Sequence, residues 1–132
     1  MQLADNTRNA ALNAMVDLVD LGSTNANGRM FIYTSGGGST LATIELNNPS
    51  FNAAAAGSVS MIVTPDVEDT AADATGVAAE MTIVDRDENV IFSGSVGTSG
   101  KDLNLNSVNL EAGVPVKITN CVLTQPAGSP AA

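Results

Sequence analysis

The first twenty residues have the spacing of apolar side chains that is typical of an amphipathic helix. Four apolar residues follow one another at i, i+3, i+4 and i+7: Leu12, Met15, Val16 and Val19. This spacing places them on one helical face. We therefore predict a helix over about residues 5–20, with Asp5 as its N-cap and Gly22 in a left-handed conformation after its end.

From residue 29 onward, short runs that alternate between apolar and polar residues are separated by Gly, Asn, Ser and Pro. This pattern is typical of strands joined by turns, and half-buried alternation favours antiparallel pairing. The predicted strands cover residues 29–34, 40–46, 58–63, 76–84, 90–96, 102–106 with a continuation to 110, and 114–124. The sequence thus predicts a mainly β protein, an antiparallel β-sandwich or jelly-roll-like barrel of 7–8 strands with one N-terminal α-helix.

Four segments interrupt this alternation. Residues 35–39 contain three consecutive glycines and predict a flexible hairpin tip, and the acidic residues 64–75 predict a loop that is functional or mobile. Residues 85–89 predict a hairpin turn, and the alternation of the last strand breaks near Asn120, which indicates a bulge. We predict a single domain over residues 1–125, followed by a flexible tail at 126–132.

The composition excludes several kinds of chemistry. The chain has 5 Lys+Arg and 14 Asp+Glu, a formal net charge of −9, no His and one Cys. A Ser-His-Asp triad and a His-based metal site both need a histidine, and so few cations do not form a phosphate-binding groove. No transmembrane run and no secretory signal are seen. We therefore expect no enzyme activity, cofactor, nucleic acid or membrane partner, and synthesis in a cytoplasm.

Acidic turns are the candidates for a metal site. Asp85, Asp87 and Glu88 offer oxygen ligands of the kind that Ca²⁺ prefers, and residues 66–73 hold a second acidic cluster. Neither cluster has the spacing of a calcium-binding loop, and Arg86 would oppose a cation. We therefore expect solvated turns and no metal.

Other polar residues have ordinary roles in this interpretation. The alternation of its strand predicts that Glu80 faces solvent, and Cys121 is expected to be a buried, inert thiol. Asp17 and Asp20 fall in the last helical turn, where the helix dipole disfavours negative charge. They are expected either to face water or to meet a cation such as Arg29 or a basic residue of a partner.

Strand edges suggest an assembly role. An open sandwich has exposed edges, and this chain has few charges within its strands but many small polar residues. Such surfaces suit contact with neighbouring subunits as well as with water. The residues predicted to contribute to subunit contacts are Leu3, Arg8, Leu12 and Arg29.

Several sequence blocks resemble a family of small structural proteins of tailed bacteriophages. These blocks are residues 3–14 (LADNTRNAALNA), 28–34 (GRMFIYT), 41–43 with 48–51, 70–76 (TAADATG) and 92–106 (FSGSVGTSGKDLNLN). They occur in the same order and span most of the chain. None is a catalytic signature, so the resemblance implies a virion component without catalytic residues.

Among virion roles, the resemblance, size and charge favour a capsid decoration (cement) protein on the outside of the shell. Its partners would then be the major capsid protein and copies of itself, and a trimer would suit such a role. The first alternative is a tail or fibre-associated protein that contacts the host surface. A carbohydrate-binding module is a third hypothesis, weakened by the absence of Trp and by the single Tyr.

Overall fold

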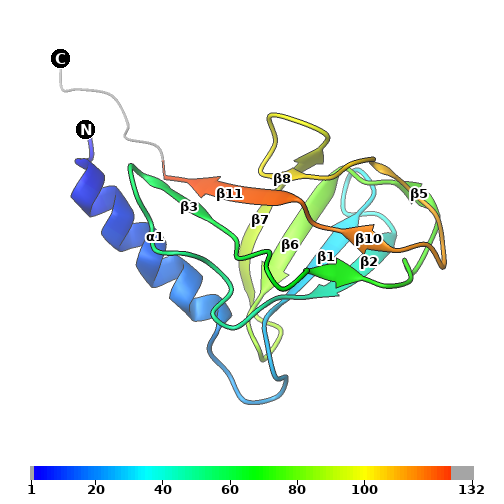
Figure 1. Ribbon diagram of the computed structural model, residues 1–132, viewed down its shortest axis with the longest axis horizontal. Helices are drawn as coiled ribbons and strands as arrows, with labels where there is room; N and C mark the ends of the chain where they lie inside the picture. Colours follow the sequence, from blue (N-terminus) through cyan, green and yellow to red (C-terminus); the bar gives the residue numbers. More distant parts are fainter. Residues whose placement is uncertain (1, 126–132) are drawn as a thin grey trace.

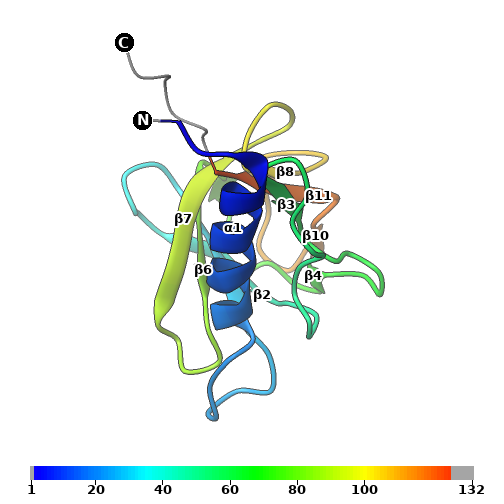
Figure 2. The ribbon, with the colours of Figure 1, turned by 90° about the vertical axis from the view of Figure 1, so that its left-hand side faces the viewer.

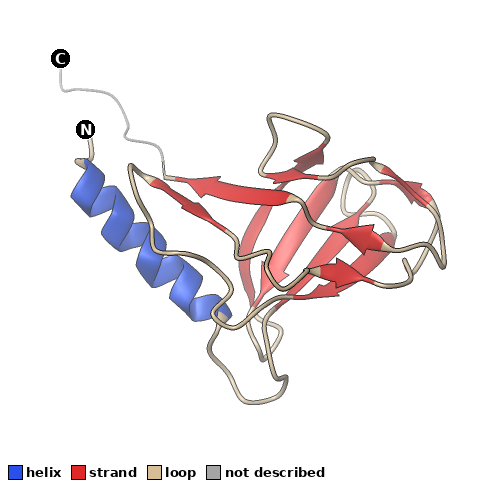
Figure 3. Cartoon of the chain, viewed as in Figure 1, coloured by secondary structure: helices blue, strands red, loops and turns tan. Residues whose placement is uncertain are grey.

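The structure is a computed structural model that describes residues 2–125, within which lie one helix and strands β1 to β11 (Figure 3). Helix α1 spans Asp5–Val19. The main sheet consists of β1 Arg29–Tyr33, β2 Thr40–Glu45, β3 Ser58–Ser60, β6 Glu80–Val84, β7 Val90–Gly97, β8 Leu103–Asn104 and β11 Asn120–Thr124. Two smaller sheets pair β4 Glu68–Asp69 with β10 Val116–Lys117, and β5 Gly76–Val77 with β9 Asn109–Leu110. The mainly β class with an N-terminal helix is confirmed, and the predicted tail at 126–132 lies outside the described residues.

The main sheet has the strand order β2-β1-β6-β7-β8-β11-β3. β2 and β3 are the two edge strands of this order and do not pair with each other. The sheet within residues 2–125 is therefore not a closed barrel. The sheet folds over, so that β3 and β11 form a second layer in front of β6 and β7 (Figures 1 and 2). Of the two predicted architectures, the structure therefore has the two-layered one and not the barrel.

One strand pair departs from the expected antiparallel order. β7 and β8 are parallel, with Val96 opposite Leu103. The short segment between them loops back and is held at its base by Asp102, whose carboxylate accepts hydrogen bonds from the Ser95 amide (3.0 Å) and hydroxyl (3.2 Å). The sheet is therefore mixed, whereas antiparallel pairing was expected.

The core lies between the two layers and is closed at one end by α1. One layer contributes Met30, Ile32, Ile44, Met81 and Ile83, and the other contributes Val59, Leu103, Cys121 and Leu123. The helix adds Leu12, Val16 and Val19, the face that its periodicity predicts. Burial of one such aliphatic side chain stabilises the fold by about 1.5–3 kcal/mol.

The last predicted strand is two strands in different sheets. The Ile118 amide donates to the Val67 carbonyl (2.9 Å), which keeps β10 beside β4, whereas Asn120 pairs with Asn104 in the main sheet. The break in alternation near Asn120 is therefore a change of sheet, and the predicted bulge is wrong.

The helix ends also differ from the prediction. Ala4 is the N-cap, and its methyl side chain can make no capping bond. Asp5, the predicted N-cap, is the first helical residue, and its carboxylate accepts from Arg8 (3.0 Å). The C-cap is Asp20, and Gly22 follows two residues later with a φ of 127°. No helix among the described residues is long and apolar enough to span a membrane.

Candidate interaction surfaces

The outer edge of β3 is covered by the chain that precedes it. The Asn52 amide donates to the Ser60 carbonyl (2.9 Å), and Ala55 and Ser58 exchange two backbone hydrogen bonds. Residues 50–55 therefore occupy the side of β3 that faces away from β11.

Helix α1 in turn covers residues 50–57. Three side chains on one helical flank accept hydrogen bonds from backbone amides of that segment: Asn9 from Gly57 (2.9 Å), Asn13 from Ala54 (2.8 Å) and Asp20 from Ser50 (3.1 Å). Burial raises the pKa of Asp20 above its ordinary value, and hydrogen bonds from Ser50 oppose this shift. Asp20 thus meets an amide, where water or a cation was expected.

Three of the predicted contact residues hold or flank the same helix. The Arg8 guanidinium donates to the Gln125 carbonyl (2.7 Å) and lies over Gly57. Leu12 is only 2% exposed and belongs to the core, while Leu3 is half-buried before the helix begins. Arg8 and Leu12 therefore attach α1 to its own sheet, and their predicted contact with another subunit stays a prediction.

The opposite edge of the sheet, β2, is covered by the acidic segment 64–75. The Asp69 carboxylate accepts from the Thr43 amide (3.1 Å), and the Asp73 amide donates to the Leu41 carbonyl (2.8 Å). This segment contains strand β4 and the buried Val67, so it is an edge cover more than a free loop. Both edges of the main sheet are therefore covered within the chain, and exposed edges no longer support an assembly role.

The glycine-rich hairpin tip is also held in place. The Glu80 carboxylate accepts hydrogen bonds from the amides of Gly36 (3.0 Å) and Gly37 (2.9 Å). Both glycines have positive φ angles, of 73° and 66°, which turn their amides toward one acceptor. Glu80 lies on the solvent side of its strand, as predicted, and is half-buried there because it holds the β1–β2 loop.

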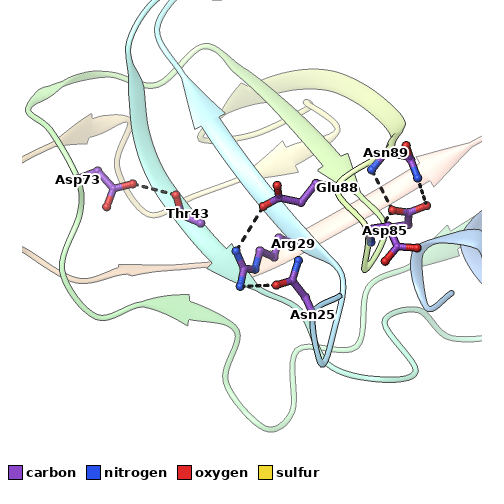
Figure 4. A network of polar contacts seen from close by, with 8 residues as sticks. Asn25, Arg29, Thr43, Asp73, Asp85, Glu88 and Asn89 are labelled. Atoms are coloured by element: carbon purple, nitrogen blue, oxygen red, sulfur yellow. Dashed lines mark hydrogen bonds and ion pairs between the residues drawn. The ribbon is translucent and has the colours of Figure 1, made fainter. Parts of the chain in front are cut away.

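The carboxylates of the 85–89 turn serve as hydrogen-bond acceptors (Figure 4). Asp85 accepts from the amides of Asp87 and Asn89, both at 2.9 Å, and from the Asn89 side chain (3.2 Å). Desolvation alone would raise the pKa of Asp85, but the hydrogen bonds from Asn89 and Asp87 outweigh it and lower that pKa.

Asp87 connects this turn to the loop after α1. Its carboxylate accepts from the amides of Ser23 and Thr24, both at 2.9 Å, and these bonds lower the pKa of Asp87. Glu88 meets Arg29 at 3.5 Å, and Arg29 also donates to the Asn25 side chain (3.1 Å). The three carboxylates thus have separate partners, and no group of three or more His, Cys, Asp or Glu in the described part of the chain is arranged to hold a metal.

Cys121 is buried in the second layer, as predicted. Burial raises the pKa of its thiol to about 12, and the negative charge of Asp102 adds to this effect. At neutral pH the group is therefore a thiol, which is a poor nucleophile.

The exposed large apolar residues fall into two groups in different parts of the molecule. At the end of α1 and the start of β7 are Leu18, Leu21 and Val90, which are 45%, 57% and 64% exposed. The second group is Val77 of β5 and Val114, which are 57% and 47% exposed. Strand alternation does not identify these three valines as exposed, because it does not register where a strand begins or ends.

A shallow groove lies beside each group. One, of about 300 Å³, lies between α1 and β7 and includes Met15, Phe92, Asp102 and Leu123 in its lining. The other, of about 270 Å³, lies between β9 and β10 and includes Leu110 and Val116. Neither groove was predicted from the sequence. Leu18, an apolar residue one turn beyond Met15 and outside the predicted buried face, was a signal for the first groove.

Known proteins offer no further guide to these surfaces. No family model, no curated protein and no solved structure matches this chain.

Proposed function

We propose that this chain is a non-enzymatic structural protein of a bacteriophage virion, a decoration protein that binds the outside of the major capsid shell and stabilises it. The sequence resemblance to small tailed-phage structural proteins suggests this role. The chemistry of the described residues agrees with it, since the only thiol is buried and the acidic turn side chains hold loops together.

The observation that carries the proposal is the position of the exposed apolar residues. They form two groups, one where α1 ends and β7 begins and the other around β5, and Figure 1 shows the end of α1 and β5 well apart. Exposed apolar groups on a small domain are typical of protein contact sites. A protein with two such groups can contact the shell with one and a neighbouring copy with the other.

Electron microscopy of the virion tests this role. We expect many copies, in symmetric positions on the outer shell, and loss of shell stability to heat when the gene is deleted. A few copies at the tail would overturn the proposal in favour of a tail or fibre-associated protein.

One observation favours a second candidate, the carbohydrate-binding module. Phe31 and Tyr33 lie on the same side of β1 with ring centroids 6.5 Å apart and an interplanar angle of 32°. They alternate with the buried Met30 and Ile32, so both rings face away from the core. Retention on a glycan array that is lost in Tyr33→Ala would support this function; absence of retention would exclude it.

A further inference from the structure

The two flanks of α1 differ in how they are used. One flank makes the hydrogen bonds to residues 50–57 described above. The other faces β7 (Figure 2) and lines the groove with Leu12 and Met15, opposite Phe92. Leu18 follows Met15 by three positions and continues this flank beyond the groove at 45% exposure. The apolar flank is therefore partly exposed to solvent, whereas the side chains of the polar flank have hydrogen-bond partners within the chain.

The end of this flank meets the β6–β7 turn. The Leu21 carbonyl accepts from the Arg86 amide (3.0 Å), and Val90 begins β7 directly after the same turn. Leu18, Leu21 and Val90 are thus brought to one end of the groove by contacts within the chain. We call these three residues with Met15 and Phe92 the α1–β7 surface.

Negative charge predominates where α1 ends, beside the α1–β7 surface. The end of α1 and the neighbouring turn carry five carboxylates and two guanidinium groups, a local charge of −3: Asp17, Asp20, Asp85, Asp87 and Glu88 against Arg29 and Arg86. Arg86 donates to the Asn25 carbonyl (2.7 Å) and Arg29 meets Glu88, so both cations are engaged. No basic residue stands in the last turn of α1, whose carbonyls add further negative potential.

We propose that the α1–β7 surface docks a segment of the shell protein that presents an apolar side chain next to Lys or Arg. The inference rests on the proposed function, because it takes the shell as the partner. The apolar side chain would cover Leu18, Leu21 and Val90, and the cation would face the helix end and Asp17. Complementary charge of this kind guides association and selects among partners.

Neither of the two exposed apolar regions of a second copy supplies this chemistry. Two α1–β7 surfaces would bring two acidic helix ends together, which is unfavourable. The other apolar region of a second copy is also acidic, since Lys117 is paired there with Asp66 (3.1 Å) and stands near Glu68 and Glu111. The partner therefore differs in charge from both exposed apolar regions of this chain.

The test measures binding of the full chain to capsids of the encoding virus that were assembled without it. Leu21→Ser and Val90→Ser alter the surface, and Val77→Ser is the matched control because Val77 and Leu21 are equally exposed, at 57%. Since Val77 belongs to the group proposed to contact a neighbouring copy, binding is compared at low occupancy of the capsid, where copies do not touch. Asp17→Lys and Glu111→Lys form the corresponding charge pair. Circular dichroism melts confirm that each variant is folded.

We expect Leu21→Ser and Val90→Ser to weaken binding about tenfold or more, as removal of apolar anchors does, and Val77→Ser to change it less than about twofold. Asp17→Lys should weaken binding at low salt, with a smaller effect at high salt, and Glu111→Lys should not. Equal binding by surface and control variants would overturn the inference and leave the proposed function standing. Failure of the unaltered chain to bind at all would overturn both.

Discussion

The two edges of the main sheet are covered by different chemistry. At β3, the cover is residues 50–57 and then α1, which buries Leu12, Val16 and Val19 beneath it. At β2, the cover is the acidic segment 64–75, which places carboxylates on the strand and has Val67 as its buried anchor. Both solve the problem that free strand edges pose.

The two covers should differ in the stability that is lost when each is detached from the sheet. Detaching α1 would expose three core side chains and leave several amides without acceptors. Detaching the acidic segment would expose less apolar area, that of Val67 and Ala72, and would leave the Thr43 amide without its acceptor. We therefore expect the helix-covered edge to be the more stable one and the acid-covered edge to be the more sensitive to its surroundings.

The largest effect is expected from Leu12→Ala. Leu12 is 2% exposed between α1 and the sheet, and its truncation leaves a cavity. The free energy of unfolding should fall by about 2–5 kcal/mol, measured by urea denaturation. A loss below 1 kcal/mol would mean that α1 contributes little to this edge.

The second-largest loss of stability is expected when a side chain that accepts a hydrogen bond at a sheet edge is removed. Asn13→Ala leaves the Ala54 amide without its acceptor beneath the helix, and should cost about 1–3 kcal/mol. Asp69→Ala removes the acceptor of the Thr43 amide at the other edge, and should cost about 0.5–1.5 kcal/mol. Equal losses in chemical denaturation would contradict the proposed difference between the edges.

Gly57→Ala tests the packing of Arg8 on the helix-covered edge. Gly57 has a φ of 76° and lies against the Arg8 guanidinium, so a methyl group adds backbone strain and displaces that side chain. Gly113→Ala is the control, because its φ is 81° but its surroundings are open. Strain alone costs about 1–2 kcal/mol, and Gly57→Ala should lower the melting temperature more than Gly113→Ala does.

The smallest effect is expected on how the stability of the fold changes with pH. The lowered pKa values of Asp85 and Asp87 mean that their contribution to stability is present above the unfolded value and is lost as pH falls through the folded value. The raised pKa of Asp20 acts in the opposite sense, because its protonation favours the folded state. Urea midpoints between pH 7 and about pH 3 should therefore fall less steeply in Asp87→Asn than in the unaltered chain, and more steeply in Asp20→Asn.

Much of the local structure could be predicted because it depends on local spacing. The apolar positions at i, i+3, i+4 and i+7 identified the buried face of α1, and alternation located β1, β2, β6 and β7. The 85–89 turn was likewise predicted from its own residues. Strand β4 was not, because two residues carry no periodic signal, and β5 and β10 were predicted only as parts of longer strands.

The roles of the acidic side chains were less predictable. Asp20, Glu80 and Asp87 accept from amides that are 30 to 64 positions away in the chain. A carboxylate in a turn has the same sequence signature whether it faces water or a distant amide. The structure alone therefore assigns these residues to holding loops.

The sequence by itself determined that the protein is a β-rich domain with one helix, a net charge of −9 and no histidine chemistry. These properties follow from residue types and near-neighbour spacing, which do not depend on the rest of the fold. Only the tertiary structure decided that both sheet edges are covered and that exposed apolar residues meet at the end of α1. Contacts between distant segments decide these features, because burial and hydrogen-bond partners exist only once the chain has folded.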